Sequence, residues 1–420
     1  QVAPGAQQVR AVHAWLVAGP GAAVTGQAQR IELIRALEEL KCAAAAVQAR
    51  LTSDVDATTR AEQAGRGLPA EEQDTSVAAQ IALARRESPY RGREHLALAR
   101  ALAEDMPHTR RALAAGRLSE YRATILVRET AFLTREDRRA VDAALCADPG
   151  VLEGAGNQAV ANRARGLAAQ LDPEAVLARR RKAETQRRIS IRPAPDTMTW
   201  LGVLAPVAHG VAVYATLRRQ AEAARAAGDP RSLDQLMVDL LVASITGRDP
   251  ALGRGVDVRV NLVMTDRSLF AGHDEPAELD GYGTIPAELA REMLARAGDV
   301  SIRRLFTHPA SGELVAMESR SRAFTDAMKT FLVLRDRTCR TPWCDAPVSH
   351  ADHVTRAADG GPTSIANGQG LCEACNYTKE APGWRTAPAP DSAPGHHRVR
   401  TTTPTGHRYT SRPPPMPGVA

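Results

Sequence analysis

Aromatic residues, cysteines and a strong excess of one charge are all scarce in this sequence of 420 residues. Aromatics make up 4%, and 54 Lys and Arg face 48 Asp and Glu, a formal net charge of +6. An excess this small over this length does not by itself indicate a nucleic-acid partner. The 44% of hydrophobic residues is enough to bury at least two cores, so we expect two or three domains.

Long uninterrupted hydrophobic runs are also missing. The longest run, residues 200–217, contains two glycines, a proline and a histidine, which argues against a transmembrane span. Residues 11–24 resemble a short signal segment, but Pro20 and Gly21 interrupt it and no clear cleavage site follows. We therefore expect a cytoplasmic protein.

The six cysteines fall into two classes. Cys42 and Cys146 stand alone on Ala-rich helical stretches, where core packing is expected. The other four form two close pairs, Cys339 with Cys344 and Cys372 with Cys375. Four thiolates are the ligand set of a closed, structural zinc site that staples a segment with little core of its own. Two disulfides or four free thiols are the alternative.

Apolar spacing predicts helices over most of the first three quarters of the chain. Residues 27–64 and 76–102 have helical spacing, and residues 106–127 suggest a helix, a break at Gly116 and a second helix from Ser119. That pair fits a DNA-reading helix-turn-helix, but pairs joined by a Gly turn are common in any helical bundle, and we favour the bundle. Thr134 predicts a further helix start by capping.

A basic stretch follows the helix start at Asp172-Pro173. It comprises residues 179–182 with Arg187 and Arg188. A solvated helix face is the favoured interpretation over a phosphate-contacting patch, because no aromatic residues are interleaved with the charges. Apolar alternation then predicts a β-hairpin from residues 189–192 and 198–201, and a further strand is expected over 256–264. A turn-rich segment covers 276–283, and helices are expected over 285–297 and 325–336.

Polar residues suited to catalysis gather between and after the cysteine pairs. They are His350-Ala-Asp352-His353, then Asn367, and finally Asn376 and Lys379. Phosphodiester hydrolysis needs a base to activate water and a hard divalent cation to neutralise developing charge. A neutral histidine suits the base, and carboxylate and amide oxygens suit Mg²⁺.

These residues resemble the HNH nuclease motif in its zinc-bearing form: Asp352-His353, Asn367 and Leu371-Cys372-x-x-Cys375-Asn376-x-x-Lys379. The resemblance implies a β-hairpin followed by a helix around one catalytic ion, Mg²⁺ or Mn²⁺, with Asp352 and Asn376 as its ligands. It implies His353 as general base and Asn367 as the residue that holds the connecting loop. Most relatives have histidine at position 376, but asparagine is found there in RNA-guided nucleases that retain activity.

Several roles in this segment stay open. Neighbours in a regular strand point to opposite faces, so Asp352 and His353 share a metal site only if the backbone turns there. Lys379 either contacts a phosphate or caps the last helix, and His350 either supports the ligands or faces solvent. Trp343 and Trp384 are expected in the core of the small domain.

A wider resemblance covers nearly the whole chain. Residues 113–119, 276–283 and 334–339 are similar to a large family that joins an N-terminal domain of unknown function to a C-terminal HNH module. We therefore predict an α+β protein: a helical-rich domain with a small antiparallel β element over 1–323, a ββα-metal HNH domain over 324–389, and a Pro/Thr-rich, strand-poor tail over 390–420.

Two functions follow from this organisation. The first is a metal-dependent endonuclease that hydrolyses DNA. The second is a catalytically weak or inactive zinc-containing DNA-binding protein of a mobile or repeated element. A purely structural interaction protein would be favoured if neither zinc nor DNA bound.

Overall fold

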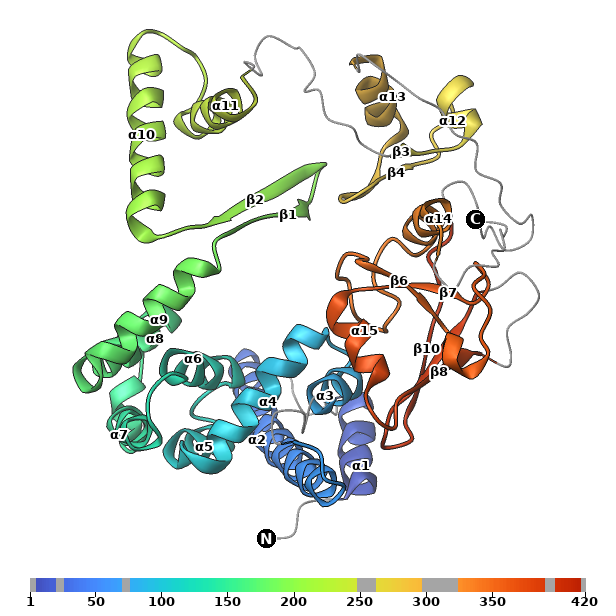
Figure 1. Ribbon diagram of the computed structural model, residues 1–420. Helices are drawn as coiled ribbons and strands as arrows, with labels where there is room; N and C mark the ends of the chain where they lie inside the picture. Colours follow the sequence, from blue (N-terminus) through green and yellow to red (C-terminus); the bar gives the residue numbers. More distant parts are fainter. Residues whose placement is uncertain are drawn as a thin grey trace. The chain divides into compact units, whose positions relative to one another are not determined.

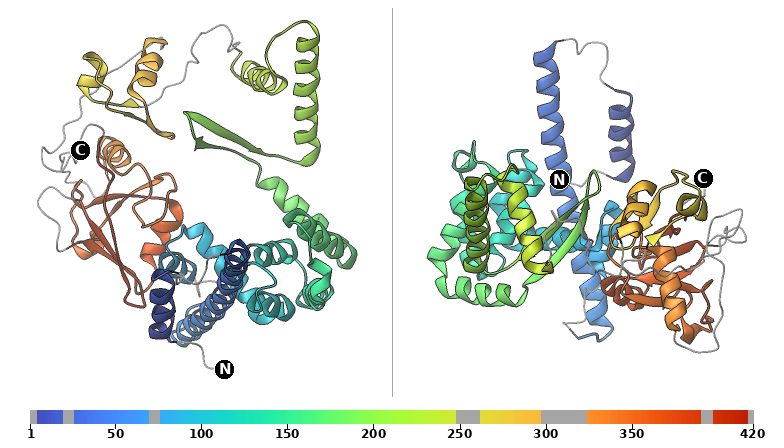
Figure 2. Two further views of the ribbon diagram at one scale, coloured as in Figure 1. Left: turned by 180° about the vertical axis from the view of Figure 1, so that it is seen from behind. Right: turned by 90° about the horizontal axis from the view of Figure 1, so that it is seen from above.

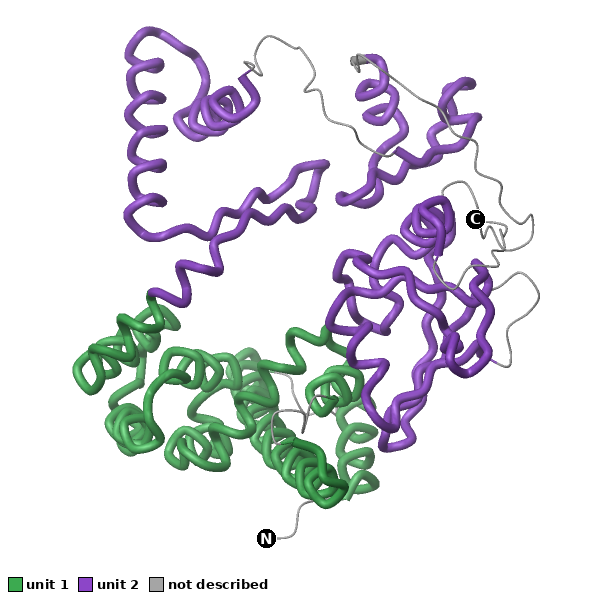
Figure 3. The backbone as a smooth tube through the Cα atoms, viewed as in Figure 1, with its two compact units in different colours: residues 1–180 green, residues 181–420 purple. Residues whose placement is uncertain are grey.

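The chain is an α+β protein with two compact units, residues 1–180 and 181–420 (Figure 3). The computed structural model describes residues 5–19, 26–69, 76–247, 262–296, 324–389 and 397–416. Most of the strand predicted over 256–264 and the predicted domain boundary at residue 323 lie outside the described residues. The division between the units falls inside the expected N-terminal domain, so the domain bounds given above stay a prediction.

The first unit is helical (Figure 1). The predicted block over 76–102 is two helices, because Arg86 adopts a left-handed conformation (φ 58°) and Ser88-Pro89 starts a new helix. The helices of this unit are α1 (Ala6–Val17), α2 (Gln27–Gly65), α3 (Val77–Arg85), α4 (Pro89–Glu104), α5 (Pro107–Ala114), α6 (Glu120–Thr130), α7 (Arg135–Cys146), the 3-10 turn Pro149–Leu152, α8 (Asn157–Leu171) and the first part of α9 (Pro173–Thr185), whose last residues belong to the second unit.

The helix starts predicted from capping residues are confirmed. Ser119 accepts a hydrogen bond from the backbone N–H of Arg122, and Thr134 from that of Asp137. The pair α5–α6 is present, but six of the eleven residues of α6 are buried. The buried residues of α6 belong to the core of the first unit, as the bundle interpretation expects.

One continuous apolar core holds these helices together. Its fully buried members include Leu98, Met106, Leu113 and Leu126. Cys42 is buried in this core and Cys146 packs against it, so the core-packing prediction for both is confirmed.

The first part of the second unit consists of small separate elements. Strands β1 (Arg188–Ala194) and β2 (Met198–Leu204) pair antiparallel, as predicted, and the long apolar run is divided between β2 and α10. No helix among the described residues is long and apolar enough to cross a membrane. The other elements are α10 (Val207–Ala226), α11 (Leu233–Thr246), β3 (Leu262–Val263), α12 (Asp266–Phe270), β4 (Ala277–Leu279), β5 (Gly283–Ile285) and α13 (Ala287–Arg296).

The C-terminal part is built on a hairpin between two helices. Its elements are α14 (Asp326–Asp336), β6 (His350–His353), the 3-10 turn Ala357–Asp359, β7 (Gly368–Leu371), α15 (Glu373–Glu380), β8 (Arg385–Pro388), β9 (Val399–Thr402) and β10 (Arg408–Ser411). The expectation of a strand-poor tail is wrong, because β9 and β10 form an antiparallel sheet with β8. Buried Val399 and Thr401 alternate with less buried neighbours on β9, a pattern too short to stand out in a Pro-rich sequence.

Candidate metal centre and active site

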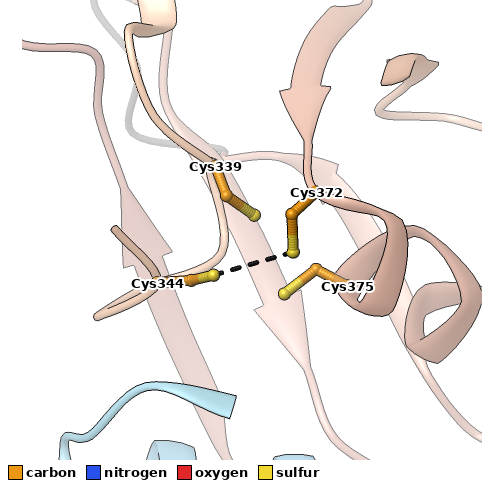
Figure 4. A group of neighbouring side chains, drawn as sticks. All are labelled: Cys339, Cys344, Cys372 and Cys375. Carbon is orange, nitrogen blue, oxygen red and sulfur yellow. Dashed lines mark hydrogen bonds between the residues drawn. The ribbon is translucent and has the colours of Figure 1, made fainter. Parts of the chain in front are cut away.

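The four predicted zinc ligands come together. The sulfur atoms of Cys339, Cys344, Cys372 and Cys375 all lie within 4.8 Å of one another, and all four residues are buried (Figure 4). The first pair is held by a tight turn, in which Cys344 N–H donates to the carbonyl of Thr341. Cys372 is the N-cap of α15, so the positive end of that helix dipole favours thiolates here.

The electrostatics of this cluster suit a dication. Hydrogen bonds from the Cys344 and Cys375 thiols lower the pKa of Cys339 to about 2. The Cys339 sulfur in turn raises the pKa of Cys344 to about 12 and that of Cys375 as well. One ionised cysteine therefore opposes the ionisation of the next, and several thiolates can coexist here only beside a cation. The donor set, its closure and its burial fit structural zinc.

The hairpin β6–β7 lies between α14 and α15 in a regular register, with Asp352 opposite Gln369 and His353 opposite Gly368. Helix α14 packs on one face so closely that a Cβ at Gly368 would lie 3.0 Å from the Leu332 side chain, and 2.9 Å from the ring of Phe324, which precedes the helix. Helix α15 contacts the other face through Lys379.

A buried ion pair before the first cysteine supports the hairpin. Arg335 donates to both carboxylate oxygens of Asp336 and to the carbonyls of Ile365 and Gly368, while Asp336 accepts from the N–H of Gly370 at 2.7 Å. No role was predicted for these two residues. Their signal was a charged pair beside the cysteine knuckle, inside the segment 334–339 that carries the wider resemblance.

Asp352, a predicted ligand of the catalytic ion, is engaged by a cation. Its Oδ2 accepts hydrogen bonds from the Lys379 ammonium and, at 3.2 Å, from the Gln369 amide. Lys379 is buried and also donates to the carbonyl of His353 at 2.6 Å. In the structure the Lys379 ammonium is engaged in these two contacts and not in a helix cap, and its contact with a phosphate stays a prediction.

His353 is held by two neighbours. Its Nε2 lies 2.9 Å from Thr363 Oγ1, and its ring packs against that of Phe324 with centroids 4.7 Å apart. Burial lowers the pKa of His353, and the nearby Lys379 adds to this while Asp352 opposes it. The ring is thereby kept neutral and able to accept a proton. Thr363 is a supporting residue that has no distinguishing signal in the sequence.

The two neighbouring residues Asp352 and His353 do not share a face of the hairpin. Their strand pairs regularly with β7, so no turn separates them. Asp352 contacts Lys379 of α15, whereas His353 contacts Phe324 on the α14 side. The backbone turn that would bring both side chains to one ion is not present.

Asn376, the second predicted ligand, is half-buried on α15. It precedes Lys379 by three residues, a spacing that puts both on one helix face, and Lys379 contacts β6. The amide of Asn376 has no hydrogen-bond partner among the described residues, so its oxygen is free to bind a ligand. Asp352 carboxylate and Asn376 amide are oxygen donors of the kind Mg²⁺ and Mn²⁺ prefer. Their chemistry fits such an ion, with Lys379 as its competitor for Asp352.

Asn367 ties the loop between β6 and β7. Its amide donates to the carbonyls of Thr355 and Pro362, at 3.0 and 2.9 Å, and its oxygen accepts from Thr355 N–H at 2.8 Å. The loop is so close here that a Cβ at Gly361 would lie 2.0 Å from the Thr355 carbonyl oxygen and 2.8 Å from the Asn367 amide nitrogen. These contacts are those of a positioning residue.

The two tryptophans of this segment differ. Trp384 is buried, as expected. Trp343 is 41% exposed and packs edge-on against Tyr409 of β10, with ring centroids 5.7 Å apart. The core prediction for Trp343 is therefore wrong, because its positive φ of 61° belongs to the knuckle turn, which directs the indole toward the C-terminal sheet.

Comparisons with known proteins agree with this architecture. A family model described as "Domain of unknown function (DUF222)" matches residues 34–336, and one described as "HNH endonuclease" matches residues 339–381. No solved structure matches the chain.

Similar proteins occur in Mycobacterium tuberculosis. The uncharacterized protein Rv2100 of strain H37Rv is 35% identical over 143 residues, as is the uncharacterized protein MT2160 of strain CDC 1551. The uncharacterized protein Rv3776 of strain H37Rv is 33% identical over 139 residues. Each match covers 33% of this chain and 24% of the relative, so the chain spans about a quarter of the length of these relatives.

Proposed function

The chain belongs to the family defined by the DUF222 domain and carries a C-terminal HNH endonuclease domain, and from this premise we propose that it is a metal-dependent endonuclease that hydrolyses DNA phosphodiester bonds. One observation carries the proposal. The segment that matches the HNH family folds as a hairpin and helix closed by four clustered cysteines, with a neutral histidine at the end of β6.

His353 is the proposed general base, and because it lies on the other face of β6 from Asp352, it is not a ligand of the ion. Thr363 holds the ring through Nε2, which leaves Nδ1 to accept the proton of the attacking water. Burial keeps the imidazole neutral and so ready for this step. Asn367 acts at a distance, because it fixes the loop that carries Thr363.

Asp352 and Asn376 are the proposed ligands of Mg²⁺ or Mn²⁺. When bound, such an ion supplies positive charge that offsets the charge developing on the scissile phosphate. Lys379 balances the Asp352 carboxylate in the structure described above. An ion that binds Asp352 therefore either displaces this ammonium from Oδ2 or uses Oδ1.

Nicking of supercoiled plasmid with added Mg²⁺ or Mn²⁺ tests the proposal. We expect His353→Ala to lower the rate about 10²- to 10⁴-fold, the usual contribution of a general base. His350→Ala is the matched control, since it removes a histidine three residues earlier in the same strand. Equal inertness of the natural protein and His353→Ala with several metals, while zinc remains bound, would reject the nuclease.

The second candidate is a zinc-containing DNA-binding protein without turnover. The ion pair between Lys379 and Asp352 favours it, because a carboxylate neutralised by a buried ammonium binds a divalent ion less well. This candidate predicts plasmid binding without nicking in either metal, and equal binding by His353→Ala.

A further inference from the structure

Exposed cations gather where α9 passes into the β1–β2 hairpin of the second unit. Figure 2 shows from two sides that the helix leads directly into this ribbon. The cations are Arg181, Lys182, Arg187, Arg188 and Arg192. None of them has a carboxylate partner within the part of the chain that the structure describes, whereas Arg179, just before them, pairs with Glu129. Positive charge is therefore left uncompensated over a short stretch.

The strand register gives the ribbon two different faces. Arg188, Arg192 and Trp200 lie on one face, because Arg192 is paired with Trp200 and side chains alternate along a strand. The Arg192 guanidinium lies over the Trp200 ring, 5.8 Å from its centroid, and the indole is 60% exposed. The opposite face is apolar and carries Ile189, Ile191, Leu201 and Val203.

This register supplies what the linear sequence lacked. No aromatic residue is interleaved with the basic run along the chain, and a solvated helix was accordingly the favoured interpretation. Pairing of the strands places Trp200 directly beside Arg192. An arginine stacked on an indole loses less freedom when it binds, so the ring holds its guanidinium ready for an anion.

We propose that this basic face of the β1–β2 ribbon, with the end of α9, is an auxiliary docking surface for double-stranded DNA. Unpaired arginines and a lysine match the phosphates of a duplex in charge, and a two-stranded ribbon has the width of a major groove. The surface rests on the proposed function in that it would hold the duplex on which the HNH module acts. It adds affinity and takes no part in the chemistry.

Binding of a labelled duplex to the full chain, in EDTA so that no cleavage occurs, tests the surface over a series of salt concentrations. We expect Arg188→Ala/Arg192→Ala to raise Kd about tenfold and to reduce the slope of log K against log salt by about two, one for each lost phosphate contact. Arg188→Lys/Arg192→Lys keeps the charge and should keep the slope. Arg110→Ala/Arg117→Ala, two exposed arginines of the first unit, is the control and should change neither quantity.

A double-mutant cycle tests the role of Trp200. We expect Trp200→Ala to raise Kd about threefold by releasing Arg192, and Trp200→Phe to recover part of the loss. The effect should vanish in an Arg192→Ala background, which a merely structural role of the indole would not produce.

Unchanged affinity and slope in Arg188→Ala/Arg192→Ala would overturn the surface, as would a natural protein that binds no duplex. The nuclease proposal fails separately. Ribbon-dependent binding without nicking in Mg²⁺ or Mn²⁺ upholds the surface and rejects the nuclease, whereas nicking with unaltered binding by the ribbon variants does the reverse.

Discussion

The helical first unit and the C-terminal HNH module solve the same problem, burial of enough apolar surface, by different means. The first unit has one core drawn from most of its helices. The described residues of the module form two small apolar groups, one around Phe324 and the α14 residue Leu332 and one made largely of the module's own cysteines. A segment whose second core consists of metal ligands depends on the metal for its fold. The stability of the first unit should therefore depend on the volume of its core side chains. The stability of the module should depend on the bound metal and on its hydrogen bonds.

Substitution of serine for cysteine should have the most different effects in the two regions. Cys372→Ser should abolish zinc binding, normally about one ion per chain, together with nicking, because structural zinc contributes about 10–16 kcal/mol to folding. Metal analysis and limited proteolysis of the module measure the outcome. Cys42→Ser, in the core of the first unit, should cost about 1–3 kcal/mol and leave the zinc content unchanged. Zinc-free protein with a folded module would contradict this contrast.

Loss of core volume should affect the first unit only. Leu126→Ala removes a buried side chain of α6 and should cost about 2–5 kcal/mol in the free energy of unfolding by urea. Zinc content and nicking should be unaffected. Tyr121→Ala, on the exposed side of the same helix, is the matched control and should change stability by less than about 0.5 kcal/mol. An equal effect of both substitutions would mean that α6 is not a core helix.

Loss of hydrogen bonds should affect the module only. Asn367→Ala leaves two carbonyls and one N–H of the loop without their partner, at a cost of about 1–3 kcal/mol for each group that stays buried. Nicking should fall because Thr363 is no longer held beside His353, while zinc stays bound. Asn367→Asp keeps the acceptor for Thr355 N–H but not the donors, and it should be intermediate if the donors matter.

The smallest expected effect is a loss of stability of the first unit at acidic pH. Burial alone would raise the pKa of Glu129, but hydrogen bonds from Arg165 and Arg128 outweigh it and lower the pKa. The stability that this carboxylate confers is complete above its unfolded-state pKa of about 4.3 and is lost as pH falls through that value toward the folded pKa. Below about pH 4.3, the urea midpoint of the Glu129→Gln variant should therefore fall less steeply than that of the natural protein. A parallel decline of both proteins would show that Glu129 is not responsible.

Local rules predicted much of the fold. Capping at Ser119 and Thr134, the helical spacing of α2 and the alternation in β1 and β2 depend on neighbours in sequence, and the structure has each of these elements. The cysteine cluster was equally predictable, because four soft ligands in two close pairs have few other uses.

Contacts between distant residues were beyond the sequence. The pairing of Lys379 with Asp352 depends on how α15 packs against β6. The exposure of Trp343 depends on a single turn with a positive φ. Strand β9 is stable because it pairs with β8 on one side and with β10 on the other, and the short pattern of β9 and β10 does not indicate these pairings. For Asp352 and His353 the sequence predicted two faces of a regular strand, and only the pairing of β6 with β7 shows that the strand is regular there.

The crowding at Gly361 also bears on how this module changes over generations. No side chain fits there without displacing the Thr355 carbonyl or the Asn367 amide, so Gly361 and Asn367 are constrained by folding alone. Folding constrains His353 only through its contacts with Thr363 and Phe324. A descendant released from selection for cleavage would therefore drift first at His353 while it kept Gly361, Asn367 and the four cysteines. That order of loss gives a criterion for recognising, among related sequences, those that have kept the fold and given up the reaction.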